Sequence, residues 1–183
     1  SDGTYVKTFD IPADGSTITE VAKLKSPTSI NMGTVYMGDF IKSDQGFYIA
    51  ASTYSSNAYV TTWTISNDGK TIAQKKYHSI SSFRDGVSVV QLDSDTYVFA
   101  ATGYGTYARS ASKYWGAMIK TFDIATDGST ITEVNGMTLA NSNVKSHPSM
   151  VKVSGDIGAF ASNHANKGKI DHVKVSSDGK TLN

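Results

Sequence analysis

Four aspartates, each followed directly by a glycine, have the residue type and regular spacing that chemistry at a repeated site would need. They are Asp14, Asp68, Asp127 and Asp178. Carboxylate oxygens are preferred ligands of Ca²⁺, so a row of calcium sites is one interpretation. An Asp before a turn glycine, however, usually caps the turn by accepting backbone hydrogen bonds. We therefore predict turn caps and no metal site, and we interpret Asp93 and Asp95 in the same way.

The histidines and the lack of cysteine give little support for catalysis. The histidines are His78, His147, His164 and His172, and no two of them have the spacing of metal ligands. His172 stands in a predicted strand where the other copies of the repeat described below have Thr. The chain contains no Cys, which excludes disulfides, thiol catalysis and Cys-based zinc sites. No nucleophile elbow, phosphate-binding loop or HExxH motif is present, so we predict no catalytic residue and no cofactor.

The segment 103–115 is the most individual part of the chain. It carries five side chains of the types that dominate binding hot spots, namely Tyr104, Tyr107, Arg109, Tyr114 and Trp115. Their aromatic faces could stack on sugar rings or pack against a protein partner. The alternative is that they fill a gap to a neighbouring part of the fold.

Composition limits the class of protein. The chain has 183 residues, of which 39% are hydrophobic and 18% charged, typical of one folded domain. Its net charge of +1 provides no basic surface for nucleic acid. No apolar run is long enough to insert into a membrane. The chain starts Ser1-Asp2-Gly3, so we expect no signal peptide, whereas many Ser, Thr, Tyr, Gly and Asn residues with few charges fit an exported protein.

The aspartates belong to a phrase that occurs four times. The copies are KTFDIPADGSTI (7–18), TTWTISNDGKTI (61–72), KTFDIATDGSTI (120–131) and HVKVSSDGKTL (172–182), with spacings of 54, 59 and 51 residues between their aspartates. Each copy is typical of a β-hairpin, because the glycine supplies the positive φ of a tight turn. Phe9 and Ile11 lie on one strand face and Val6 on the other, so both faces are apolar and we expect neighbouring sheets on both sides.

A second hairpin precedes three of these phrases. The predicted pairs of strands are 35–42 with 47–52, 87–92 with 97–102, and 149–153 with 157–162. Two hairpins make a unit of four antiparallel strands in about 55 residues, which is the pattern of a propeller blade. The sequence therefore predicts an all-β fold, a β-propeller of four-stranded antiparallel blades.

The pattern V-S-G-D, A-F-A, K-T-F-x-I-x-x-D-G-x-x-I resembles the blades of repeat-built β-propellers in prokaryotic cell-surface and secreted proteins. The resemblance covers essentially the whole chain and implies an extracellular or cell-surface location. The sequence departs from the WD40, kelch and Asp-box signatures, so the resemblance implies an architecture more specifically than an activity.

The copies amount to about three and a half blades in a single domain. The predicted blade parts are 1–24, 25–80, 81–140 and 141–183. Open sheets expose pairing edges and apolar faces. We expect a second chain to complete the ring, since two such chains give seven blades, or else a longer polypeptide. Closure of the last blade by residues 1–24 is the less favoured alternative, because that ring would be too tight.

Loops on one end of a propeller usually form its binding face, and this places Tyr54, Arg84, Asp85 and His147 near the segment 103–115. We predict a non-enzymatic extracellular scaffold that binds a glycan or a protein there. One alternative is a hydrolase or lyase with an axial active site, since the separation of carboxylates in space cannot be read from a sequence. The other is a purely structural subunit of a surface layer or filament.

Overall fold

Every secondary-structure element that the structure describes is a β-strand. The computed structural model describes residues 5–25, 35–54, 57–81, 83–103, 116–140, 148–164 and 167–183, and all structural statements concern these residues. The strands are β1 (Tyr5–Asp10), β2 (Thr19–Lys25), β3 (Val35–Lys42), β4 (Tyr48–Tyr54), β5 (Asn57–Ile65), β6 (Ile72–Ser81), β7 (Phe83–Gln91), β8 (Thr96–Gly103), β9 (Gly116–Ile124), β10 (Ile131–Ala140), β11 (Ser149–Ser154), β12 (Ile157–His164) and β13 (Lys167–Lys174).

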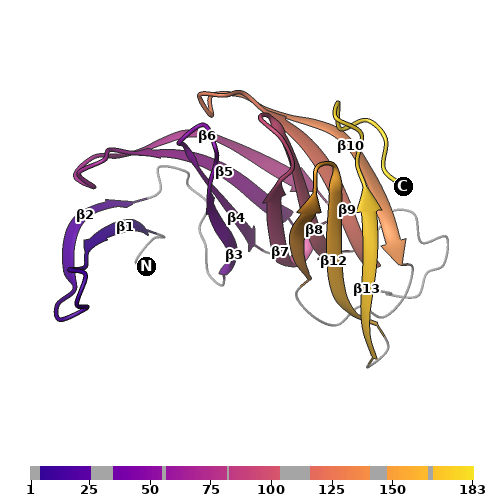
Figure 1. The fold of residues 1–183 in the computed structure, drawn as a ribbon, viewed down its shortest axis with the longest axis horizontal. Coiled ribbons are helices and arrows are strands. Elements are labelled where there is room, and N and C mark those ends of the chain that lie inside the picture. The colour runs from indigo at the N-terminus through magenta and orange to yellow at the C-terminus, as the bar shows by residue number, and fades with distance from the viewer. Residues whose placement is uncertain are drawn as a thin grey trace.

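These strands form four antiparallel sheets that follow one another in chain order. Sheet 1 is the hairpin β1–β2, sheet 2 contains β3 to β6, sheet 3 contains β7 to β10, and sheet 4 contains β11 to β13. In Figure 1 the array runs from sheet 1 on the left to sheet 4 on the right, and β1 lies far from the C-terminus. The predicted all-β fold of four-stranded antiparallel sheets is confirmed, and the sheets do not close into a ring.

The Asp-Gly turns form as predicted. Gly15, Gly69, Gly128 and Gly179 all have φ between 67° and 73°. In each turn the preceding aspartate accepts a backbone N–H from two residues further on, at 2.9 to 3.1 Å. The pKa of all four carboxyl groups lies below the usual value, chiefly because of a neighbouring serine side chain for Asp68, Asp127 and Asp178 and because of the Ser16 backbone N–H for Asp14. The aspartates therefore act as turn caps in the structure.

Two apolar clusters hold the sheets together. One lies between sheets 2 and 3 and includes Ile49, Val60, Phe99 and Phe122, and the other lies between sheets 3 and 4. The innermost strands approach so closely that a Cβ on Gly38 of β3 would lie 1.9 Å from the carbonyl oxygen of Val87 in β7. Small side chains on β8, where Ala100 and Ala101 are fully buried, leave room for the same close packing.

The prediction of burial on both faces is correct for the central sheets and wrong for the ends. Phe122 of sheet 3 is fully buried, but Phe9, at the same position of the repeat in sheet 1, is 50% exposed. Ile170 of sheet 4 is 69% exposed, whereas its counterpart Ile119 is buried. The reason is that, among the described residues, each end sheet has a neighbouring sheet on one side only.

Candidate functional site

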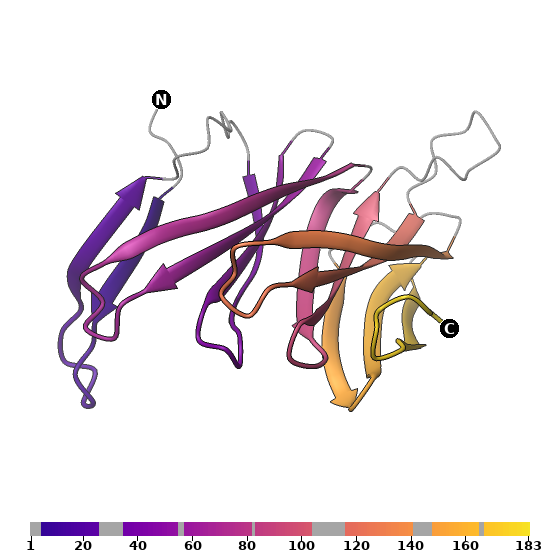
Figure 2. The ribbon, with the colours of Figure 1, turned by 90° about the horizontal axis from the view of Figure 1, so that it is seen from above.

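Three of the predicted binding residues lie at strand ends along one edge of the array. Tyr54 is the last residue of β4 and pairs with Asn57 at the start of β5. Arg84 and Asp85 are near the start of β7, where Asp85 pairs with Thr102 of β8. Figure 2 shows the ends of β2, β4 and β8 along the same edge, at the top of the view. The side chains of these three residues lie outside what the structure describes.

The remaining predicted binding residues lie outside the described residues altogether. They are Tyr104, Tyr107, Arg109, Tyr114, Trp115 and His147. Their flanks are described: β8 ends at Gly103, β9 begins at Gly116, and these two glycines pair with each other. The segment 104–115 therefore leaves and re-enters sheet 3 at the edge where Arg84 and Asp85 are found.

A buried hydroxyl group lies next to this edge. Thr53 precedes Tyr54 in β4, and its side chain is fully buried. Its Oγ1 is the only buried side-chain N or O atom of the described residues that has no hydrogen-bond partner. Such a group usually finds a partner, since leaving it unpaired costs on the order of 1 to 3 kcal/mol. Thr53 was not among the predicted residues, and its type gives no signal in a chain so rich in Thr.

The first strands of sheets 2, 3 and 4 are connected by a polar relay that the sequence analysis missed. The Asp39 carboxylate of β3 accepts the Ser88 hydroxyl of β7 at 2.6 Å and the Val89 N–H at 2.9 Å. The Ser88 Oγ in turn accepts the Met150 N–H of β11 at 3.1 Å. The serine hydroxyl and the carboxylate therefore both take part in hydrogen bonds between sheets.

A second polar cluster joins sheets 2 and 3 at the opposite edge, among the turns. The Tyr97 hydroxyl and the Gln91 amide both donate to Gln45 Oε1, at 3.4 and 3.0 Å. Burial raises the pKa of Tyr97 well above its usual value. Burial, with the nearby charges of Asp95 and Asp93, also raises the pKa of Asp123 at this edge. The cluster can hold the turns together through neutral hydrogen bonds.

One contact between sheets occurs three times with the same geometry. A threonine hydroxyl in the third strand of one unit donates to the carbonyl of the Asp-Gly turn glycine in the next unit. The pairs are Thr8 with Gly69 at 2.7 Å, Thr62 with Gly128 at 2.6 Å, and Thr121 with Gly179 at 2.7 Å. We call this the Thr–Gly contact. The fourth unit has the exposed His172 at the threonine position.

The described ranges contain no group of three or more His, Cys, Asp or Glu side chains that could hold a metal ion. The part of the chain that the structure describes has no helix with the length and apolar character needed to cross a membrane.

Comparisons with known proteins identify the fold and no family. No protein-family model and no curated protein matches the chain. Its structure is similar to the crystal structure of a protein from Lactobacillus plantarum, with a TM-score of 0.68 and 13% sequence identity. The match covers 97% of this chain and 49% of that one, so this chain spans about half of the length of its structural neighbour. That neighbour has a propeller-like fold, and at this identity the likeness shows a propeller-like arrangement of sheets for this chain as well.

Proposed function

We propose that this chain is a non-enzymatic scaffold, exported to the surface of a prokaryotic cell, that binds a glycan or a protein at the edge formed by Tyr54, Arg84, Asp85 and segment 104–115. The supporting observation is the strand register. Asp85 of β7 pairs with Thr102 of β8, and Gly103 of β8 pairs with Gly116 of β9, so the residues that flank the segment lie at the same edge as the start of β7. A rigid frame that presents a long loop rich in Tyr, Trp and Arg is a common design for recognition.

The chemistry of the loop favours a neutral or weakly charged ligand. Its four aromatic residues are accompanied by two cations, Arg109 and Lys113, and the whole chain has a net charge of +1. Tyr and Trp offer large apolar faces with a polar tip, which suits both sugar rings and protein hot spots.

Binding to a glycan array, followed by titration calorimetry with the best glycan, tests the proposal. Trp115→Ala and Tyr104→Ala should each weaken binding at least tenfold, as loss of a hot-spot aromatic does. Tyr77→Ala is the matched control, because this exposed aromatic belongs to β6 and not to the loop. Equal binding by all three variants would exclude the loop as the site. If no glycan binds, a protein partner is left, and the same variants test a partner obtained by cross-linking on cells.

A structural subunit of a surface assembly is the second candidate function. The observation in its favour is that seven of the nine large exposed apolar side chains of the described residues belong to sheets 1 and 4, at the two ends of the array. Enzymatic activity at the Asp39 and Ser88 pair is less well supported, because Asp39 already accepts two hydrogen bonds from β7.

A further inference from the structure

Seven of the large exposed apolar side chains of the described residues belong to the two end sheets. In sheet 1 and its turn they are Tyr5, Phe9, Ile11 and Ile18, and in sheet 4 they are Val151, Val153 and Ile170. The other two, Phe40 and Tyr77, belong to sheet 2. Exposed apolar patches of this kind mark interaction surfaces.

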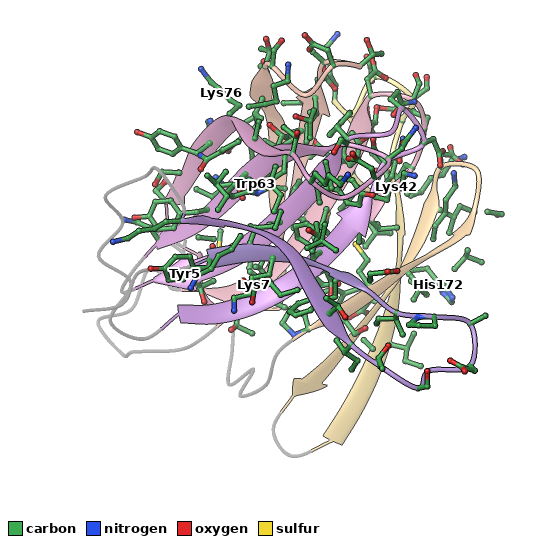
Figure 3. The ribbon with its side chains drawn as sticks, turned by 90° about the vertical axis from the view of Figure 1, so that its left-hand side faces the viewer. Tyr5, Lys7, Lys42, Trp63, Lys76 and His172 are labelled. Carbon is green, nitrogen blue, oxygen red and sulfur yellow. The ribbon has the colours of Figure 1, made fainter. Side chains whose placement is uncertain are left out.

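The first of these surfaces contains the outward side of the hairpin β1–β2, which we call the N-face. Phe9, Ile11 and Ile18 are 50%, 57% and 70% exposed there. In sheet 3 the same repeat positions carry Phe122, Ile124 and Ile131, all buried against sheet 2. Figure 3 looks onto this end of the molecule, with Tyr5 and Lys7 on the front hairpin. The N-face therefore has the side chains of an interior interface, and no strand that the structure describes covers it.

The second surface is the outward side of sheet 4, which we call the C-face. Ala161 pairs with Ile170 there, and Ala159 pairs with His172. Sheet 3 has the same arrangement on its side toward sheet 4, where Ala100 pairs with Ile119 and Val98 pairs with Thr121. In sheet 3 these four side chains are fully buried. The C-face therefore repeats the other half of the interior interface.

Each face carries one of the two positions of the Thr–Gly contact, the turn glycine on the N-face and the donor residue on the C-face. Gly69, Gly128 and Gly179 all lie beside a threonine or phenylalanine of the preceding unit, but the Cβ position of Gly15 has nothing within 4 Å. On the C-face, the donor position of the contact is occupied by His172, which is exposed. A histidine ring N–H can donate to a carbonyl oxygen as a threonine hydroxyl does.

We propose that the N-face of one molecule binds the C-face of a second copy of this chain, head to tail, with His172 donating to the Gly15 carbonyl of the other copy. A second copy is the occupant that the observations favour, because the chain makes the Thr–Gly contact three times between its own units and buries the corresponding apolar faces between sheets 2 and 3 and between sheets 3 and 4. The contact joins two different faces, so it is heterologous and propagates into a closed ring or an open filament, depending on the rotation it imposes. This inference is independent of the proposed ligand-binding edge.

Light scattering coupled to size-exclusion chromatography of mixed variants tests the head-to-tail geometry. Phe9→Asp disables the N-face and Ile170→Asp disables the C-face, and both side chains are exposed, so the fold should survive. Each variant alone should be monomeric at concentrations at which the wild type associates, with self-association at least tenfold weaker. Mixed together they should form a one-to-one dimer, because each supplies the face that the other has lost. Thr126→Asp, on an exposed turn of sheet 3, is the control for added charge and should associate like the wild type.

The alternatives give different outcomes. If the N-face binds a second N-face, or the C-face a second C-face, one of the two variants still dimerises alone. This result would overturn the head-to-tail proposal. A wild-type chain that stays a 19.5 kDa monomer at all concentrations would also overturn it. Circular dichroism of the variants separates loss of association from loss of fold.

Two changes at His172 test the proposed hydrogen bond. His172→Thr recreates the residue of the interior contact and should associate at least as tightly as the wild type. His172→Asp replaces the donor by a carboxylate that accepts only, and should weaken association about tenfold or more. Weaker association of His172→Thr would contradict the assigned role of this position.

Discussion

Replacement of Thr62 by valine should reveal how much one Thr–Gly contact contributes to stability. Thr62 is fully buried, and its hydroxyl lies 2.6 Å from the Gly128 carbonyl oxygen. Valine has nearly the same shape but leaves that buried carbonyl without its donor, which should cost about 1 to 3 kcal/mol. With a urea m-value of about 2 kcal/mol/M, a loss of 2 kcal/mol lowers the unfolding midpoint by about 1 M.

Thr8→Val is the matched comparison, because it removes the same contact where water can reach it. Thr8 and Gly69 are only half-buried, so water can replace the lost donor, and the expected cost is less than about 1 kcal/mol. Urea titrations followed by Trp fluorescence and by circular dichroism measure both variants. A neutral Thr62→Val, or a Thr8→Val that costs as much as Thr62→Val, would refute the reasoning that burial determines the value of this contact.

Three further changes test the packing and the turns. Phe122→Ala should lower the free energy of unfolding by about 3 to 5 kcal/mol, because it leaves a cavity in the core. Phe9→Ala changes the same repeat position where the side chain is half-exposed, and should lower it by less than half as much. Thermal unfolding compares the two variants. Gly38→Ala places a methyl group against the Val87 carbonyl and should cost about 3 kcal/mol or prevent folding, so wild-type stability would contradict the close strand packing. A neighbouring serine hydroxyl is the chief reason that the pKa of Asp178 is lowered to about 2. Because this is below the unfolded pKa of about 4, the Asp178 carboxylate stabilises the fold above about pH 4, and this contribution is lost as the pH falls toward 2. The difference in thermal midpoint between wild type and Asp178→Ala should therefore be constant above about pH 4 and shrink below it.

The local structure followed from the sequence because short-range rules determine it. An Asp-Gly pair between two alternating apolar segments specifies a hairpin, and the four turns have the glycine φ values and aspartate caps that the repeat predicted. The repeat also gave the correct grouping into four-stranded sheets, since consecutive hairpins with this spacing pair with each other. The recurring apolar positions and Asp-Gly pairs made every copy a check on the others.

The contacts between sheets could not be predicted in the same way. The relay from Asp39 through Ser88 joins residues 49 positions apart, and neither residue type is unusual in this chain. The Thr–Gly contact was equally hidden, although an alignment of the four copies shows a threonine at three of the four positions. That conserved hydroxyl on an otherwise buried strand was the signal available for it. The predicted binding loop stays a prediction, because its residues lie outside the described ranges.

The Thr–Gly contact has a consequence for how such a chain can change its length. The donor is a single hydroxyl group, and the acceptor is a main-chain carbonyl present in every unit, so no unit needs a partner designed for it alone. Duplication or loss of a whole unit within the gene would preserve each remaining junction. Growth by this route needs no compensating substitutions inside the array, and selection is then free to diversify the loops along the rim.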